Sequence, residues 1–470
     1  MTSRSAQIRF AFMQYASRLA CVLACALACL AICVPTASAE VRSTDIICGQ
    51  TVAQRGFTSS LCPGIEANHA MLIDEDGKIY FERDAHSATK IASVTKVMTA
   101  IVAMEYNPAL DATITVTEEA AEVGESTANL QEGDTLTLKN ALTAMMVASG
   151  NDAAESIAAS LGAQMLSDDG SSSSSSEEAC VARFVQAMND KATEMGLEDT
   201  LFTNPHGLDD GDNEGDQHST ASDVAAEVML AMQNEDFRSI VGNATAKVQL
   251  TRDGEKATIE LESTDELLTS YDGTVGVKTG FTDLAGACFA GANDHDGKEY
   301  YAIVLDSPDE AQRFTDTSTL WDWCYNYLIE YQLVNTPDTA EVTTEDGSTD
   351  TTPVLAYVAH SDWMDVSVPA TVANPDETMK IFTLDGNVSQ EMTVEDLHGY
   401  VNAGDKVGTI TFKQHNEVIA TIDLVAAQDV AGPNPIEAVS IWWQRLTGNN
   451  TVAQSVLVNE SMLVIDKTAV

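Results

Sequence analysis

The chain has 470 residues and a formal net charge of −48, with 72 acidic residues against 24 lysines and arginines. A surface this acidic repels nucleic acid and anionic membranes, so both are excluded as general partners. The length predicts two or three domains with ample core, and the charge is typical of a very soluble exported protein or of a salt-adapted one.

The first 39 residues have the features of a secretory signal peptide. Three arginines precede an apolar run at 19–34, and the small residues 37–39 form a site for cleavage after Ala39. An uncleaved anchor is the alternative, but the run has 16 residues and a membrane span needs about 20. We therefore expect export to the cell envelope or the medium. Residues 1–39 contain no acidic residue, so cleavage leaves 431 residues with a net charge of −51.

Five of the nine cysteines follow the predicted cleavage site. An exported protein can form disulfides, and Cys48 and Cys62, which flank a short segment, are the best pair, although a sequence does not fix connectivity. The odd number leaves at least one thiol unpaired within a monomer. No spacing of cysteine and histidine is typical of a zinc site, so no metal is predicted.

The first elements of the mature chain are a hairpin and a helix. Residues 70–90 alternate apolar and polar side chains around the turn sequence DEDGK, which predicts a β-hairpin. A helix is expected at 90–103, and the run 134–150 predicts a second helix that Gly150 interrupts. One hairpin is thus followed by successive helices.

A third helix is expected to begin at residue 151, with Asn151 or Asp152 as its cap. The segment 167–178 reads SDDGSSSSSSEE and contains no apolar residue. Its low complexity and acidity predict a disordered surface loop, inserted between helices.

Helices are expected next at 180–196 and 220–234. Five segments rich in strand-forming residues follow, at 245–252, 256–263, 273–281, 286–294 and 299–307. A final helix is expected at 311–333. Together with the early hairpin, this order predicts one α+β domain over residues 40–334, whose antiparallel sheet is assembled from both ends of the domain.

The rest of the chain is predicted to contain a linker, a small domain and a tail. Residues 335–353 are polar and rich in proline and threonine, which is typical of a linker. Residues 354–432 contain four strand-like runs and predict a small all-β domain. The tail, 433–470, includes a short amphipathic segment at 436–446 that is too short to span a membrane.

Ser93 and Lys96 are three residues apart at the front of the first expected helix. On a helix this spacing places the two side chains on one face, where the hydroxyl and the amine can meet. A serine hydroxyl needs an adjacent base to be a good nucleophile, and a lysine serves only if its pKa is lowered by burial or a nearby cation. Alone, the pair is weak evidence for function, because this spacing is common by chance and a helix cap with a surface lysine explains it.

A second polar element lies at the junction of the next two helices. Ser149, Gly150 and Asn151 form a break that can expose both polar side chains on one side. The structural interpretation is a helix–helix turn with an asparagine cap. The functional interpretation is a hydroxyl that relays a proton and an amide that orients the amine.

The third element is Lys278, Thr279 and Gly280 at the end of a strand-like run. Lys278 and Gly280 share a face of the strand, and Gly280 removes a side chain where a ligand backbone would approach. Lys278 would add a cation that holds a carboxylate and disfavours protonation of Lys96. An edge strand with a solubilising lysine is the alternative.

These three elements occur in the order typical of the β-lactamases and penicillin-binding proteins. The chain resembles the serine D-Ala-D-Ala carboxypeptidases, the low-molecular-mass penicillin-binding proteins. The likeness covers residues 68–333, including the segments IASVTKVMTA, DTLFTNPHGLD and VGVKTGFTDLAGACFAG and Arg313. Residues 400–430 resemble the family's C-terminal β-domain. The implied fold is a DD-peptidase/β-lactamase-like catalytic domain, an antiparallel sheet with a helical cluster, followed by a small all-β domain.

The resemblance implies an acyl-enzyme mechanism without metal or organic cofactor. Ser93 would attack the penultimate D-Ala carbonyl of a peptidoglycan stem peptide, and Lys96 would take its proton. Ser149 would help pass that proton to the leaving D-Ala, and Asn151 would position Lys96 and the substrate amide. β-Lactams, which mimic the D-Ala-D-Ala bond, should acylate Ser93.

The same resemblance implies a binding set for the substrate. Lys278, Thr279 and Arg313 would hold its terminal carboxylate. The backbone N–H groups of Ser93 and Phe281 would form the oxyanion hole, where each donor is typically worth ~3–4 kcal/mol. The family often ends in a membrane anchor, and because this tail matches poorly we expect at most a weak membrane or wall association.

Two other functions are considered. A class A β-lactamase needs a glutamate that activates the deacylating water, but no ExxLN segment lies between Asn151 and Lys278, and Phe281 differs from the small residue of that family. A non-catalytic cell-wall-binding protein would not need the site residues together. His206 is interpreted as a structural turn residue rather than a base.

Overall fold

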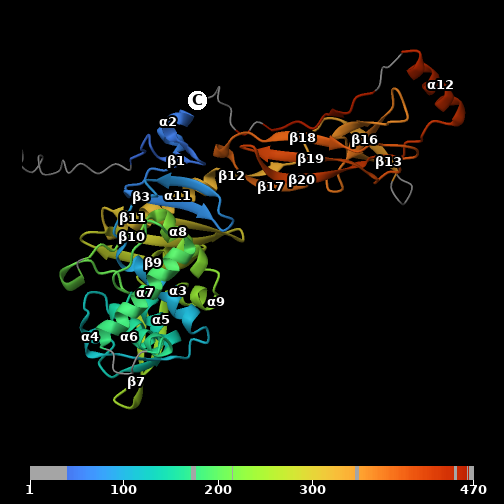
Figure 1. Cartoon of the computed structure of the whole chain (residues 1–470). Coiled ribbons are helices and arrows are strands. Elements are labelled where there is room, and N and C mark those ends of the chain that lie inside the picture. Colours follow the sequence, from blue (N-terminus) through green and yellow to red (C-terminus); the bar gives the residue numbers. More distant parts are fainter. Residues whose placement is uncertain are drawn as a thin grey trace, which may run out of the picture. The chain divides into compact units, whose positions relative to one another are not determined.

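The structure is a computed structural model that describes residues 40–170, 176–213, 215–343, 349–448, 453–462 and 464. The predicted signal peptide lies outside the described residues. The chain forms two compact units, drawn in Figure 1. The first contains the chain up to Asp45 and Thr51–Leu320, and the second contains Ile46–Gln50 and the chain from Trp321 onward.

The main sheet of the first unit is antiparallel and carries one wall of the site. Its strands follow the spatial order β4-β3-β11-β10-β9. Their bounds are β3 (His69–Asp74), β4 (Ile79–Arg83), β9 (Thr274–Thr282), β10 (Gly286–His295) and β11 (Lys298–Ser307). Because β3 and β4 come from one end of the domain and β9–β11 from the other, the predicted assembly is confirmed.

The helices of this unit form a cluster next to the sheet (Figure 1). They are α3 (Lys96–Tyr106), α4 (Glu118–Glu122), α5 (Leu138–Val147), α6 (Asn151–Asp168), α7 (Glu177–Met195), α8 (Ala221–Ala231), α9 (Glu235–Val241), α10 (Leu267–Ser270) and the start of α11 (Glu310–Asn326). Every residue of α3 from Lys96 to Met104 is buried, because small and apolar side chains surround it on all sides. This helix is therefore the fixed centre against which the site is built.

Shorter elements accompany these. They are β1 (Ile46–Ile47), β2 (Gln50–Thr51), α2 (Val52–Arg55) and the 3-10 turns η1 (Ser59–Leu61), η2 (Ala92–Thr95) and η3 (Gly211–Asn213). Of these, β1 and the first residue of β2 fall in the second unit and the others in the first. Cys62 carries a free thiol, so the disulfide considered with Cys48 is not formed.

A second sheet of four strands was only partly predicted. Its order is β5-β6-β7-β8, with bounds β5 (Thr113–Thr115), β6 (Thr135–Thr137), β7 (Thr245–Arg252) and β8 (Glu255–Glu262). The expected helix at 134–150 is wrong at its start, because the β-branched residues of β6 pair with β5 and the Thr137 hydroxyl accepts the Asn140 N–H to cap α5.

The ends of α6 and α7 also differ from the prediction. The N-cap of α6 is Gly150, so neither Asn151 nor Asp152 is the cap. Helix α6 continues to Asp168, and α7 begins at Glu177 after the Ser176 cap, so both ends of the expected surface loop are helical. Residues 171–175 lie outside the described residues.

The second unit is a β-domain with a helix near its end. Its main sheet has the order β18-β19-β20-β16-β15-β21. The strands are β15 (Ala356–Ala359), β16 (Ser367–Thr371), β18 (Ser389–Val394), β19 (Lys406–Gln414), β20 (Glu417–Ala426) and β21 (Val456–Leu457). The predicted small all-β fold is therefore present, and the turn η4 (Thr383–Asp385) and helix α12 (Pro435–Leu446) accompany it.

Two predictions near the start of this unit are wrong. The expected helix to 333 ends at Asn326, and β12 (Leu328–Gln332) pairs instead with β17 (Thr378–Phe382). The expected linker forms an antiparallel hairpin, β13 (Thr339–Thr343) with β14 (Thr349–Pro353). Within the described part of the chain, no helix has the length and hydropathy needed to cross a membrane.

Candidate active site

Ser93 and Lys96 meet because the chain makes a 3-10 turn at this point. Ser93 is the second residue of η2, and Lys96 is the first residue of α3. Residues three apart eclipse in a 3-10 turn, and the Lys96 Nζ lies 2.7 Å from the Ser93 Oγ. Ser93 is not a helix cap, since Ile91 has that position, and Lys96 is fully buried rather than a surface residue.

The Lys96 amine has three partners that decide what it can do. Besides Ser93, its Nζ lies 2.7 Å from the Asn151 Oδ1 and 2.9 Å from the backbone oxygen of His206. The two oxygens can only accept hydrogen bonds, so they take the two N–H groups of a neutral amine. Its lone pair then faces the Ser93 hydroxyl, which is the geometry of a general base.

The surroundings of Lys96 favour the neutral amine. Burial lowers its pKa well below the ordinary value, and the positive charge of Lys278 lowers it further. The negative charge of Asp152 acts in the opposite direction. The charge of Lys278 thus acts in the direction that the sequence predicted.

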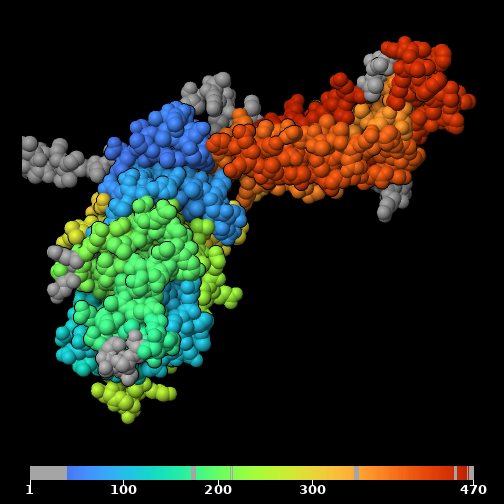
Figure 2. Space-filling model, viewed as in Figure 1, coloured from blue at the N-terminus to red at the C-terminus, as the bar shows by residue number. Residues whose placement is uncertain are grey.

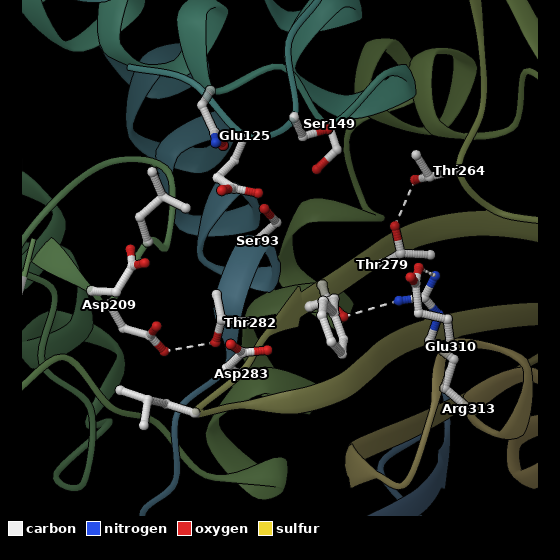
Figure 3. Close-up of a pocket in the computed structure, with 17 residues that line it drawn as sticks. Ser93, Glu125, Ser149, Asp209, Thr264, Thr279, Thr282, Asp283, Glu310 and Arg313 are labelled. Atoms are coloured by element: carbon white, nitrogen blue, oxygen red, sulfur yellow. Dashed lines mark hydrogen bonds and ion pairs between the residues drawn. The ribbon is translucent and has the colours of Figure 1, made fainter.

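The junction between α5 and α6 orients the Asn151 amide. Ser149 adopts a left-handed backbone, with φ of 56°, between the end of α5 and the Gly150 cap. The Asn151 Nδ2 donates to the Gly124 carbonyl at 3.0 Å, which leaves its Oδ1 for Lys96. A non-glycine residue at positive φ costs energy and is typical of functional sites, and here it turns the Ser149 side chain toward the cleft (Figure 3).

Gly280 allows strand β9 to approach the nucleophile. A Cβ at Gly280 would lie 2.9 Å from the Ile91 oxygen and 3.0 Å from the Ser93 nitrogen. The sequence suggested that a ligand backbone would approach Gly280. The backbone of Ile91 and Ser93 occupies that space instead. Phe281, the next residue, lines the same cleft as Ser93.

Lys278 lies behind the sheet wall of the cleft. Its Nζ donates to the Thr279 carbonyl at 2.7 Å, and its side chain is fully buried. Burial, followed by the positive charge of Arg313, lowers the pKa of Lys278 to about 7. Asp265 is a buried carboxyl whose negative charge opposes this shift. Lys278 therefore acts on the cleft through its charge.

The cleft has a volume of about 570 Å³ and lies between the helix cluster and the sheet. Figure 3 shows Ser93 near its centre, with Ser149 and Glu125 from the helix side and Thr279 and Arg313 from the sheet side. Of the predicted residues, those that line it are Ser93, Ser149, Asn151, Thr279, Gly280, Phe281 and Arg313. Lys96 and Lys278 are buried behind the lining.

A loop at 124–130 was missed by the sequence analysis. Asp152 holds it, because the carboxylate accepts the Ala128 and Leu130 N–H groups at 3.0 Å each. The loop brings Glu125 and Ser126 to the cleft. From the sequence, Asp152 was considered only as a possible helix cap.

The loop that contains His206 closes another side of the site. Burial lowers the pKa of the His206 ring to about 3, so the ring is neutral. Its Nδ1 accepts the Leu208 N–H at 3.2 Å, and its Nε2 lies 3.7 Å from the Glu155 carboxylate. The ring is therefore structural, as expected, whereas the backbone oxygen of His206 holds Lys96.

Asp209, on the same loop, was also missed. Its Oδ2 accepts the Thr282 hydroxyl at 2.8 Å, which joins this loop to the end of β9 (Figure 3). Among the described residues, no group of three or more histidine, cysteine or acidic side chains is placed to hold a metal ion.

A hydroxyl beside a buried amine, with a second hydroxyl and a cationic wall, defines a serine enzyme of acyl transfer. A family model described as D-alanyl-D-alanine carboxypeptidase matches residues 57–309, more than half of the chain. The chain therefore belongs to this family and is a serine DD-peptidase. A second model, described as the C-terminal domain of penicillin-binding protein 5, matches residues 365–431.

Relatives agree with this assignment. The chain is 27% identical over 378 residues to D-alanyl-D-alanine carboxypeptidase DacF of Bacillus subtilis, which covers 78% of this chain and 86% of the relative. It is 31% identical over 255 residues to a D-alanyl-D-alanine carboxypeptidase of Streptomyces sp. strain K15, which covers 53% of this chain and 82% of the relative. The DD-carboxypeptidase function predicted from the sequence is confirmed over the β-lactamase and the non-catalytic alternatives.

Solved structures give the same fold. The Streptomyces K15 DD-transpeptidase superposes with a TM-score of 0.51 at 29% identity, over 56% of this chain and 98% of that one. The carboxypeptidase DacD of Francisella tularensis gives a TM-score of 0.51 over 78% of this chain and 94% of that one. Since its identity is 21%, it supports the fold alone.

Proposed function

We propose that the protein removes the terminal D-Ala from peptidoglycan stem peptides through an acyl-enzyme on Ser93. The observation that carries this proposal is the set of partners around Lys96. Two acceptor oxygens and the Ser93 hydroxyl surround a buried amine whose pKa is lowered. With its pKa lowered, a neutral Lys96 donates to the two oxygens and keeps a lone pair for the Ser93 proton.

In the acylation step, the Ser93 Oγ forms a bond to the carbonyl carbon of the penultimate D-Ala, and its proton passes to the Lys96 Nζ. The backbone N–H groups of Ser93 and Phe281 stabilise the oxyanion, at about 3–4 kcal/mol per donor. As the C–N bond breaks, the proton reaches the leaving D-Ala amine by way of Ser149. In deacylation, water attacks the ester carbonyl carbon and gives its proton to Lys96, and Lys96 returns a proton to the Ser93 Oγ as the ester C–O bond breaks.

The sheet wall holds the terminal carboxylate in this proposal. Thr279 and Arg313 line the cleft, and Arg313 offers a planar guanidinium that suits a carboxylate. Lys278, buried behind them, adds a positive charge below about pH 7. A penicillin carries a carboxylate near its reactive amide and would bind in the same way.

The test is the release of D-Ala from an N-acylated peptide ending in D-Ala-D-Ala, by the wild type and by Ser93→Ala. We expect release by the wild type only, together with a long-lived penicilloyl adduct. Rapid repeated hydrolysis of penicillin would favour a β-lactamase. Absence of both adduct and D-Ala release would contradict the proposal.

We also infer that the protein is exported, as residues 1–39 indicate, and that α12 contacts a membrane surface. The large apolar side chains of α12 are mostly in water: Ile436 is 82% exposed, Val439 66%, Trp442 60%, Trp443 60% and Leu446 63%. Figure 2 shows α12, in red, at the surface of the second unit. Tryptophan on the apolar face of a short helix is typical of helices that lie in a membrane interface.

Flotation with neutral phosphatidylcholine vesicles tests this inference. We expect the wild type to float with the vesicles and the double variant Trp442→Ala, Trp443→Ala to remain in the dense fraction. Val418→Ala is the matched control, because Val418 is equally exposed but lies on β20. Equal flotation of the wild type and the double variant would contradict a role for α12.

A further inference from the structure

Arg313 has an incomplete set of hydrogen bonds. It lies in the first turn of α11, and 5% of its side chain is exposed. Its Nη1 donates to the Gly280 carbonyl at 3.0 Å, and its Nη2 donates to the Glu310 carboxylate at 3.0 Å. The Nε is buried and has no partner among the described residues. A buried donor left without an acceptor is costly, so a ligand that supplies an acceptor gains affinity.

Glu310 already occupies one side of this arginine. Its side chain is 64% exposed, it lines the same cleft, and it lies three residues before Arg313 on one helix (Figure 3). Its carboxylate has the chemistry of a peptide's C-terminus. An incoming terminal carboxylate must therefore displace Glu310 from the Nη2 or share the guanidinium with a like charge.

We propose that Glu310 is a specificity-determining residue that competes with the substrate's terminal carboxylate for Arg313. This inference rests on the proposed role of Arg313 in binding that carboxylate. The cost of displacing Glu310 is the same for every anion, so a peptide whose other contacts with the cleft offset this cost is favoured over a weakly held anion. Because the pair is exposed on the Glu310 side, its removal should change affinity by about two- to fivefold.

Glu266 offers a matched control. Its charge acts on Arg313 in the same direction as that of Glu310, whereas burial is the main influence on this guanidinium and lowers its pKa. Glu266 does not line the cleft, and none of the contacts of Arg313 described above involves it. Glu266→Gln thus removes a nearby charge without removing a competitor.

The first measurement is KM and kcat for a peptide ending in D-Ala-D-Ala. We expect Glu310→Gln to lower KM about two- to fivefold with kcat little changed, and Glu266→Gln to have a smaller effect. The same peptide with a C-terminal amide should show no gain from Glu310→Gln. A higher KM for Glu310→Gln, which would mean that Glu310 positions Arg313, or an equal gain with the amide, would overturn the inference.

The second measurement does not depend on turnover. The same peptide is titrated by calorimetry into Ser93→Ala and into the double variant Ser93→Ala, Glu310→Gln. We expect the Kd to fall about two- to fivefold in the double variant. An unchanged or larger Kd would overturn the inference. If the wild type released no D-Ala from the peptide, that result would contradict the proposed function alone.

Discussion

The two walls of the cleft each contain a fully buried lysine with a lowered pKa, yet the two lysines have different partners. Lys96, on the helix side, is held by two acceptor oxygens and faces a hydroxyl. Lys278, on the sheet side, donates to the carbonyl of its own strand neighbour. Burial alone therefore does not decide the role of a lysine. The partners of Lys96 support the proposed role of a base, whereas those of Lys278 support the proposed role of a charge.

The positive charge of one basic side chain also lowers the pKa of the next, from Arg313 to Lys278 and from Lys278 to Lys96. Arginine stays protonated in proteins. Burial of Lys278 is the main cause of its lowered pKa, and the positive charge of Arg313 lowers that pKa further. The charge of Lys278 in turn lowers the pKa of Lys96. The sheet wall thus helps to keep the base of the helix wall neutral.

Removal of the base should have the largest effect. Lys96→Met keeps a long apolar side chain but has no lone pair for the Ser93 proton, so we expect acylation by penicillin to slow about 10²–10⁴-fold. Stopped-flow or gel-based acylation rates measure this effect. Lys247→Met is the control, because Lys247 is 71% exposed on β7. Acylation of the Lys96 variant at the wild-type rate would show that the two lysines do not differ as described.

Removal of the second lysine should have a smaller effect and a distinct pH signature. Lys278→Met removes a positive charge that lowers the pKa of Lys96, so that pKa should rise. Since the base must be neutral, the acid limb of kcat/KM should move to higher pH. Loss of a charged contact worth about 1.5–3 kcal/mol predicts a fall of about 10–100-fold at pH 7. An unmoved acid limb would contradict the coupling between the walls.

Asp152→Asn should shift the same limb in the opposite direction. Its negative charge raises the pKa of Lys96, so its removal should lower that pKa and move the acid limb to lower pH. The weaker hold on the loop at 124–130 should reduce kcat/KM about tenfold, as expected for loss of one charged hydrogen bond. Asp134→Asn, at an equally buried carboxylate that pairs with Arg252, is the control and should leave the limb in place.

The smallest expected effect is on stability, behind the helix wall. Burial, followed by the charge of Glu177, raises the pKa of Glu155 to about 7. An acid whose pKa is raised on folding stabilises fully below its unfolded pKa of about 4.3, and this contribution is lost as pH rises toward 7. At pH 8, Glu155→Gln should thus have a higher Tm than the wild type, and its free energy of unfolding should be larger by up to about 2 kcal/mol. The difference should be smaller at pH 5.

Thermal unfolding at both pH values measures this difference. Glu194→Gln is the control, because Glu194 lies on the surface of α7 and should behave as the wild type at either pH. A wild-type Tm that stays level between pH 5 and pH 8, with the Glu155 variant parallel to it, would show that Glu155 titrates normally.

The sequence predicted those parts of the site that local spacing controls. Ser93 and Lys96 were found because residues three apart meet on any helix, and Ser149 and Asn151 because a glycine break marks a junction. The reason for Gly280 could not be predicted, since a close approach of two distant backbones leaves no pattern. The contact of the His206 backbone oxygen with Lys96 was missed for a related reason. Every residue has a backbone oxygen, so no residue type in the sequence marks this contact.

The errors in the fold follow a similar rule. The apolar run after residue 326 fits a helix and a strand equally well by pattern, and only its pairing with β17 decides for the strand. The hairpin of β13 and β14 consists largely of threonine and acidic residues, which gives no apolar alternation to detect. Long, strongly patterned strands such as β10 and β11 were placed to within one residue.

The central claim is that Ser93 is the nucleophile activated by Lys96, and mass spectrometry after penicillin treatment tests it most directly. Intact mass and peptide mapping would be compared for the wild type and for Ser93→Ala across the pH range. We expect one adduct per chain, on the peptide that contains Ser93, with a yield at short times that falls as Lys96 becomes protonated at low pH. An adduct on another residue, or equal modification of Ser93→Ala, would contradict the account.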